Sequence, residues 1–197
     1  MSHHFPDVSD CLLLDFINTK ISKNGKITEL IHSKNDLSSW FDHEIKKNNH
    51  YSYQLMLFKH YFEKVDDISS IIAFRDSLHE QLSTLIIGEN IQDELLHLIK
   101  STTKAHPFSV ELINDALSFT PITIDRHSFE SLILLDLAQF ISNGDIHKLS
   151  RCSNPECVLL FVDRTGRRKW CSMKICGNRH KVEAFAKRKK QASNEAI

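Results

Sequence analysis

Four of the five cysteines lie close together towards the end of the chain, at Cys152, Cys157, Cys171 and Cys176. Their spacing is C-x4-C-x13-C-x4-C, so a segment long enough for a hairpin separates two close pairs. A close pair in a tight turn can present two sulfurs to one metal ion, at about 2.3 Å for zinc. Because four thiolates suit Zn²⁺ and leave no position open for water or substrate, the pattern predicts one structural zinc ion per chain.

Other uses of four thiols compete with this prediction. Cysteines scattered through a core would rarely form two pairs of equal spacing in one basic segment. The first residues lack signal-peptide features, and no apolar run reaches the ~20 residues of a membrane span, so we expect a cytoplasmic protein. Disulfides are disfavoured in that compartment. An iron–sulfur cluster also uses four thiolates. His180 could replace one ligand, although the four cysteines already complete the site.

The residues around the cysteines predict the elements that position them. Asn154 and Pro155 fall inside the first pair, where a knuckle turn is needed. Residues 158–172 should form a strand, a turn at 163–166 and a second strand. After Gly177, which permits close approach of the backbone, the sequence has the pattern of a helix. Knuckle, β-hairpin and helix together describe a treble-clef-like zinc finger.

The rest of the chain is expected to be mostly helical. Apolar residues at helical spacing, with end signals, predict helices over residues 36–47, 51–65, 66–87, 91–104 and 128–144. Ser128 is expected to cap the last of these helices. The less regular segments predict a small hairpin over 107–125, a helix or a buried strand over 11–19, and a turn or loop over 20–35.

These elements give a fold class that is mainly α (α+β). We expect a helical amino-terminal domain with a small β-hairpin or sheet over residues 1–147, which we call the body. The zinc finger follows over residues 148–190, and a disordered tail over 191–197. The boundary should fall near residues 145–150, between Gly144 and Cys152.

Charge is distributed unevenly, although the formal net charge of the chain is zero. Residues 151–190 contain twelve Lys and Arg against three Asp and Glu, whereas residues 1–150 contain thirteen against twenty-one. This division predicts a basic module that binds polyanions, joined to an acidic body that does not. The acidic body could also dock on the basic finger and mask it.

The run RCSNPECVLLFVDRTGRRKWCSMKICGNRHKVEAFAKRKK resembles the CGNR zinc-finger family, which is named for the tetrapeptide at residues 176–179. The matching positions include the four cysteines, Leu160, Phe161, Asp163, the run from Trp170 to Met173, and Lys181. The family is described as stress-induced transcription regulators. The resemblance therefore implies a bacterial protein whose finger binds DNA.

The amino-terminal LLLDFINT is similar to the opening of the ABATE domain, which usually precedes this finger. The matching positions are Leu14, Asp15, Phe16, Asn18 and Thr19. Asp15 and Asn18 would share one face of a helix, where they could bind a small effector or form caps or a buried hydrogen-bond network. Cys11, inside the same apolar run, is expected to be a buried core thiol.

Basic side chains of the finger are the candidates for contact with nucleic acid, because Lys and Arg that neutralise phosphates release counterions. The candidates are Arg164, Arg167, Arg168, Lys169, Asn178, Arg179, Lys181, Lys187 and Arg188. Alternatives stay open for several of them. Asn178 could cap the helix and orient a ligand sulfur, and Arg179 could pair with Asp163. Phe161 and Trp170 could stack on bases, although packing in the small core is favoured.

No catalytic set stands out in the sequence, which has no Gly-rich phosphate loop, no G-x-S-x-G and no H-E-x-x-H. We therefore expect a regulator rather than an enzyme, with duplex DNA as partner, an effector for the body, and no membrane. Because one small finger contacts only a few base pairs, a homodimer joined through the body is plausible. An RNA-binding or protein-interaction module is the alternative function.

Overall fold

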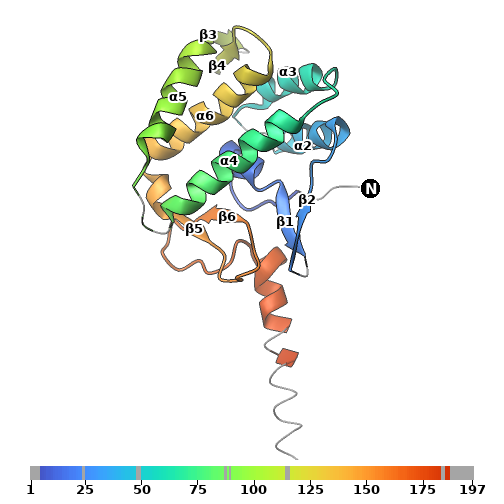
Figure 1. The fold of residues 1–197 in the computed structure, drawn as a ribbon, viewed down its shortest axis with the longest axis vertical. Coiled ribbons are helices and arrows are strands. Elements are labelled where there is room, and N and C mark those ends of the chain that lie inside the picture. The colour runs from blue at the N-terminus through green and yellow to red at the C-terminus, as the bar shows by residue number, and fades with distance from the viewer. Residues whose placement is uncertain are drawn as a thin grey trace, which may run out of the picture.

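The computed structural model describes residues 5–23, 25–47, 50–86, 88, 90–113, 116–182 and 185–186. Within them lie six α-helices and three two-stranded antiparallel sheets (Figure 1). The helices are α1 (Leu12–Ile17), α2 (Lys34–Lys46), α3 (Ser52–Phe62), α4 (Ser69–Leu85), α5 (Asp93–Ala105) and α6 (Arg126–Ser142). The strands are β1 (Lys20–Lys23), β2 (Lys26–Glu29), β3 (Phe108–Ile113), β4 (Ala116–Pro121), β5 (Leu149–Arg151) and β6 (Leu160–Val162). The mainly α fold class with a small amount of β structure is confirmed.

Helix α6 is the centre of the body. Its apolar residues are fully buried on several faces, which is the pattern of a helix enclosed by the core. The ring of Phe129 lies 5.4–6.2 Å from five other aromatic rings, those of Phe16, Trp40, Phe41, Phe58 and Phe62. Helices α1, α2 and α3 therefore meet around one side chain of α6.

The five predicted helices are confirmed as α2 to α6, the predicted hairpin over 107–125 as β3 and β4, and the undecided segment 11–19 contains the helix α1. The predicted cap of α6 is wrong. The helix begins two residues earlier, and the side chain of Asp125 accepts hydrogen bonds from the backbone N–H and the hydroxyl of Ser128, both at 2.8 Å.

Residues 20–35, predicted as a turn or loop, contain a hairpin. Strand β1 pairs with β2, and Gly25 in the connection has a φ of 73°, which glycine adopts without steric cost. Buried Arg75 of α4 holds this hairpin against the body. Its guanidinium donates to the two carboxylate oxygens of Glu29 at 2.6 and 2.5 Å and to the hydroxyl of Thr19 at 3.0 Å.

The finger differs from the predicted order of its strands. Strand β6 pairs with β5, which precedes the first cysteine, and residues 163–172 contain no second strand. Asp163 explains the difference, because its carboxylate accepts from the backbone N–H groups of Thr165, Arg167 and Arg168 and turns the chain back. The returning segment meets the knuckle instead, where Ser153 N–H donates to the carbonyl of Lys169 at 2.8 Å.

The finger packs directly on the body. A short 3₁₀ turn, η1 (Asp145–Lys148), leads from α6 into β5 where the sequence places the boundary. The side chain of Asn18 pairs with Leu160 like a strand neighbour, since its amide donates to the carbonyl at 2.8 Å and its oxygen accepts from the N–H at 3.0 Å. His79 contacts the carbonyl of Val158 at 2.8 Å, and Arg151 donates to the carbonyl of Ser83 at 3.0 Å.

In the part of the chain that the structure describes, no helix combines the length and the apolar character that a membrane span requires.

Candidate metal centre

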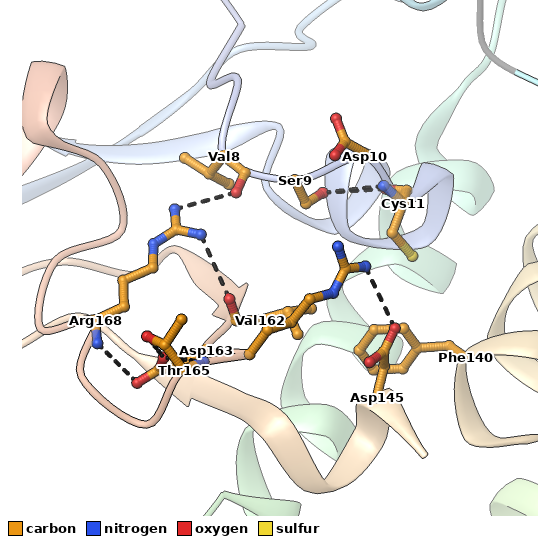
Figure 2. A pocket seen from close by; sticks show the side chains of 11 residues that line it. Val8, Ser9, Asp10, Cys11, Phe140, Asp145, Val162, Asp163, Thr165 and Arg168 are labelled. Atoms are coloured by element: carbon orange, nitrogen blue, oxygen red, sulfur yellow. Dashed lines mark hydrogen bonds and ion pairs between the residues drawn. The ribbon is translucent and has the colours of Figure 1, made fainter. Parts of the chain in front are cut away.

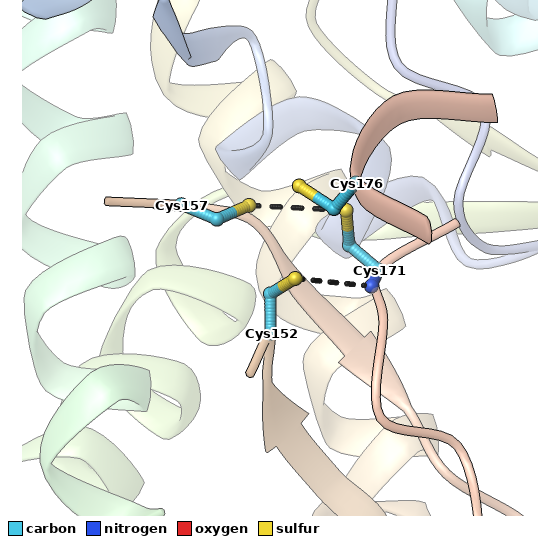
Figure 3. Close-up of side chains that lie close together, drawn as sticks. All are labelled: Cys152, Cys157, Cys171 and Cys176. Atoms are coloured by element: carbon cyan, nitrogen blue, oxygen red, sulfur yellow. Dashed lines mark hydrogen bonds between the residues drawn. The ribbon is translucent and has the colours of Figure 1, made fainter. Parts of the chain in front are cut away.

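The four cysteines predicted as ligands come together in the finger. Their sulfurs all lie within 4.8 Å of one another and point towards a common centre (Figure 3). Cys152, Cys171 and Cys176 are buried, and Cys157 is half-buried. Thiolates about 2.3 Å from a shared tetrahedral metal would lie about 3.8 Å apart. The Cys157 and Cys171 sulfurs are separated by 3.8 Å, which fits that geometry.

Each pair of ligands is held by local structure. Asn154 shapes the first turn, since its carbonyl accepts from Cys157 N–H at 2.9 Å and its side-chain oxygen accepts from Glu156 N–H at 3.1 Å. The second pair is placed by a π-helical turn, η2 (Met173–Gly177), which Ser172 caps by accepting from the N–H of Ile175 at 3.0 Å. Residues 178–182 continue as a helix.

Polar hydrogens also point at the sulfurs. The N–H of Cys171 approaches the sulfur of Cys152 at 3.4 Å, and the amide of Asn154 approaches the sulfur of Cys176 at 3.7 Å. Such donors stabilise negative sulfur and orient it. Capping and orienting a sulfur were one of the two roles open to Asn178 from the sequence. In the structure Ser172 caps the turn and Asn154 approaches a sulfur, and Asn178 is exposed.

The titration of the thiols shows why a cation suits this cluster. A hydrogen bond with Cys171 lowers the pKa of the Cys157 thiol to about 6, whereas burial raises the pKa of the Cys176 thiol to about 11. The hydrogen bond with Cys157 and then burial hold the pKa of Cys171 far above its usual range. Thiolates so close together repel one another, and a bound metal cation offsets that repulsion.

Arg168, predicted to contact nucleic acid, is turned into the protein. Its guanidinium donates to the carbonyls of Val8 and Trp170, both at 3.1 Å, and to that of Cys171. It also lies 4.4 Å from the ring centre of buried Phe161. Figure 2 shows this side chain reaching towards the amino-terminal segment. The structure therefore gives Arg168 a bracing role, which depends on contacts that the sequence does not reveal.

The other predicted nucleic-acid residues are placed at the surface where they are described. Arg164, Arg167, Lys169, Asn178 and Lys181 are exposed and Arg179 is half-buried. Arg164 pairs with Asp145 at 3.4 Å. Asp163, a possible partner of Arg179 from the sequence, accepts hydrogen bonds from backbone N–H groups of its own turn. Lys187 and Arg188 lie outside the described residues, as does the predicted tail.

Two aromatic side chains of the finger, Phe161 and Trp170, both pack with the cysteine cluster but differ in burial. Phe161 is fully buried with the cysteines, as core packing requires. Trp170 is half-buried, and its ring centre lies 4.6 Å from that of exposed His180. His180 thus contacts the ring of Trp170 at a tilt of 33° and is not part of the four-cysteine cluster found among the described residues.

The two predicted effector residues of the body have separate surroundings. Asn18 is fully buried, and its side-chain amide forms the two hydrogen bonds to Leu160 of the finger described above. Asp15 pairs with Lys47 at 2.5 Å and accepts from the hydroxyl of Ser9 at 3.0 Å. Asp15 does line a cleft of about 740 Å³, whose walls also include Tyr51, Asp136 and, from the finger, Arg164.

Cys11 lies in the same cleft and is half-buried rather than a core residue. Its sulfur is 3.2 Å from a carboxylate oxygen of Asp136, and burial, followed by the charge of Asp136, raises the pKa of this thiol far above its usual range. Cys11 is therefore a poor nucleophile.

Residues 148–189 match the family model of the CGNR zinc finger. No curated protein matches the chain. The family match and the four converging sulfurs agree with each other, so this segment is a zinc finger that holds one structural zinc ion through Cys152, Cys157, Cys171 and Cys176. Bound there, the metal supplies cross-linking of the two cysteine pairs and leaves no open coordination position.

Proposed function

We propose that the chain is a DNA-binding transcription regulator of the stress-responsive kind, which acts in the bacterial cytoplasm. The exposed cations around the closed zinc site carry this proposal. Arg167, Lys169, Lys174 and Lys181 are exposed, and no carboxylate of the described residues forms an ion pair with them. Cations that are not neutralised within the protein can neutralise phosphates and release counterions.

The charge of the whole segment supports the same function. Residues 151–190 carry nine more basic than acidic residues. Four thiolates on one Zn²⁺ contribute a local charge of about −2, so the loaded finger keeps about +7. The body carries the opposite sign and would be repelled by DNA, which favours docking by the finger end of the molecule.

The cleft beside Asp15 supports a sensing role for the body, of the type that the ABATE resemblance implies. Its volume falls in the range of small-molecule sites. Arg164 of the finger and Asp145 of η1 both line it and pair with each other. An effector that changes this pair would alter the cationic surface of the finger.

A homodimer is part of the proposal, because one finger of this size covers only a few base pairs. The hairpin β3–β4 offers a candidate contact. Val110, Leu112 and Leu117 are 62%, 75% and 58% exposed, and register places Leu112 opposite Leu117 on one face. Sedimentation of the zinc-loaded chain measures its mass, and a monomer at every concentration would contradict this part of the proposal.

The direct test is binding of the zinc-loaded chain to a random duplex, followed by anisotropy at about 50 mM and about 200 mM salt. Four phosphate contacts predict about a 100-fold loss of affinity across that range. A chelated sample should not bind, because the finger loses its cross-link. Absence of binding at low salt would contradict the proposal.

Matched variants assign the contact surface. Lys169→Gln and Lys181→Gln should each reduce the salt slope by about one unit. Arg179→Ala should weaken binding as well. Lys100→Gln removes one charge from α5 of the body, and it should leave affinity and slope unchanged. A loss of affinity in Lys100→Gln equal to that in the finger variants would mean that overall charge, not the finger, governs binding.

One observation favours an alternative, a protein-interaction module. Val182 and Phe185, three residues apart, are 68% and 65% exposed in the terminal segment, which is an unusual position for large apolar side chains. An RNA partner is the other alternative. Competition between the duplex and a structured RNA of equal length separates those two nucleic acids. A DNA affinity that is unchanged in Val182→Ser would mean that DNA binding does not explain the exposed apolar pair.

A further inference from the structure

A small hollow of about 100 Å³ lies on the finger, between the knuckle and the start of the terminal helix. Its lining comes from both halves of the zinc site: Ser153, Asn154, Pro155, Trp170, Cys176, Arg179 and His180. One ordered water needs roughly 10–15 Å³ of comparable space, so the hollow can admit a much larger group. The metal cross-link fixes its two sides relative to each other.

The wall of the hollow is aromatic and open to solvent. Trp170 and His180 form a ring pair with centres 4.6 Å apart and planes tilted by 33°. Trp170 is half-buried and His180 exposed, in contrast to the fully buried Phe161. Core packing alone does not need a tryptophan at the rim. Surface aromatic rings are the platforms on which proteins stack nucleobases, since every base has a π-face.

The rim supplies polar groups of the kinds that contact bases and phosphates. Arg179 contributes a guanidinium, and exposed Ser153 contributes a hydroxyl. Asn154 is fixed by its hydrogen bond from Glu156 N–H, so its amide faces the cluster in one orientation. Exposed Lys169 and Lys181 stand next in sequence to Trp170 and His180, where a phosphate backbone leading into the hollow would pass.

Within a regular duplex the faces of the bases are covered by their neighbours, and only their edges can be reached. An aromatic-walled hollow is complementary to a base face, not to an edge. Unpaired bases in loops, bulges, single strands or extruded positions expose that face. We infer that this hollow binds one unpaired nucleobase, stacked against the Trp170–His180 pair, with Arg179 on its phosphate or its edge. The inference rests on the proposed nucleic-acid function and names the substrate class of the same surface.

The test compares four labelled probes of one sequence with the zinc-loaded full chain: a perfect DNA duplex, a duplex with a one-nucleotide bulge, single-stranded DNA and single-stranded RNA. We expect each of the three probes with unpaired bases to bind at least about 5-fold more tightly than the perfect duplex. That factor is the lower end of the affinity that stacking of one base provides. The DNA and RNA arms identify the source of the base.

Tryptophan fluorescence gives a second readout that a purely electrostatic contact would not move. The chain has two tryptophans, and Trp40 is fully buried in the body. Stacking of a base should therefore quench the emission of Trp170 and leave that of Trp40 unchanged. Trp170→Phe, which keeps an aromatic ring in the core, identifies the Trp170 contribution by difference.

Trp170→Leu and His180→Ala should lower affinity for the bulged duplex by about 5-fold to 150-fold, whereas Lys100→Gln on α5 should not change it. Zinc content is measured in each variant, and His180→Ala, at an exposed position, keeps the test valid if Trp170→Leu fails to fold. Equal binding of all four probes with unchanged emission would overturn the inference and leave the proposed function standing. No binding of any probe at low salt would overturn both.

Discussion

The guanidinium of Arg168 ties the cysteine-bearing segment of the finger to the amino-terminal segment of the chain. Arg168 stands in a run of three basic residues, Arg167 to Lys169, so its type predicts contact with phosphate. In the structure its guanidinium instead donates to four backbone carbonyls from three parts of the chain: those of Val8, of Val162, and of the neighbouring Trp170 and Cys171. A planar group with five donors can satisfy several carbonyls at once, which a lysine cannot do.

Arg168→Lys should therefore destabilise the finger while keeping its charge. The loss of charge-assisted hydrogen bonds to buried carbonyls predicts a cost of about 1–3 kcal/mol and faster release of zinc to a chelator. Arg167→Lys, at the exposed neighbouring position, is the matched control and should change stability by less than about 0.5 kcal/mol. Equal stability of the two variants, measured by urea denaturation, would show that Arg168 is not a brace.

Glu44 is the other residue whose behaviour departs from its type. It is 1% exposed, beside Asp15 at 4% and the ammonium group of Lys47, which lies 3.8 Å from Glu44 and 2.5 Å from Asp15. Burial, followed by the charge of Asp15, raises the pKa of Glu44 to about 8. Burial also raises the pKa of Asp15 to about 6, so at neutral pH Asp15 is ionised and pairs with Lys47 while Glu44 is largely protonated.

A carboxyl group with a raised pKa contributes stability that is complete below its unfolded value and is lost as pH rises through its folded value. For Glu44 that window runs from about 4.5 to about 8. Between pH 6 and pH 8, where zinc stays bound, the chain should lose about 2 kcal/mol through this group. Glu44→Gln should flatten the stability curve over this range, and Glu111→Gln on exposed β3 should not. A curve unchanged in Glu44→Gln would contradict the buried protonated state.

At the scale of elements, the sequence predicts those whose apolar residues are periodic and misses those held by polar contacts. Helices α2 to α6 have a strong periodic pattern and were predicted within a few residues. The β1–β2 hairpin has few apolar residues, and its place depends on the ion pair between Arg75 and Glu29, which are 46 positions apart. No local pattern records such a contact.

The same distinction holds within the metal centre. Cysteine spacing is a local signal, so the four ligands could be predicted. The pairing of β5 with β6 could not be predicted, because it depends on two polar contacts. Asn18, which follows α1, occupies the other side of Leu160, and the Asp163 turn directs the chain away from a second strand. The sequence also did not reveal that the amino-terminal segment contributes to the finger, where Val8 packs in the buried cluster with the cysteines.

That segment leads to a prediction at the same scale. Removing residues 1–9 should weaken the zinc site, because Val8 leaves the cysteine cluster and Arg168 loses a carbonyl partner. We expect zinc release to a colorimetric chelator to become at least about tenfold faster, as a loss of about 1.4 kcal/mol would produce. The intact chain is the reference. Equal release from the intact and the truncated chain would show that residues 1–9 do not support the site.

At the scale of the whole molecule, the finger and the body share one network. Leu149 and Leu160 belong to the core of the body, while Val8 of the body belongs to the cysteine cluster. Hydrogen bonds from Asn18, His79 and Arg151 cross between the two parts. The finger is therefore not a free module on a linker, and loss of its metal ion should lower the stability of the body.

Zinc removal should therefore destabilise the body and not only unfold the finger. Cys157→Ser removes one zinc ligand. Without zinc the finger no longer covers the body or forms hydrogen bonds with it. We therefore expect the unfolding free energy of the body to fall by about 2–4 kcal/mol. Cys11→Ser is the matched control, since serine keeps a donor for Asp136 outside the cluster, and it should retain zinc and most of its stability. Each variant is made in a Trp170→Phe background, so that the emission of Trp40, fully buried in the body, follows the body alone during denaturation. If the Trp40 transition of Cys157→Ser coincides with that of the zinc-loaded chain, the two parts are energetically independent despite their contacts.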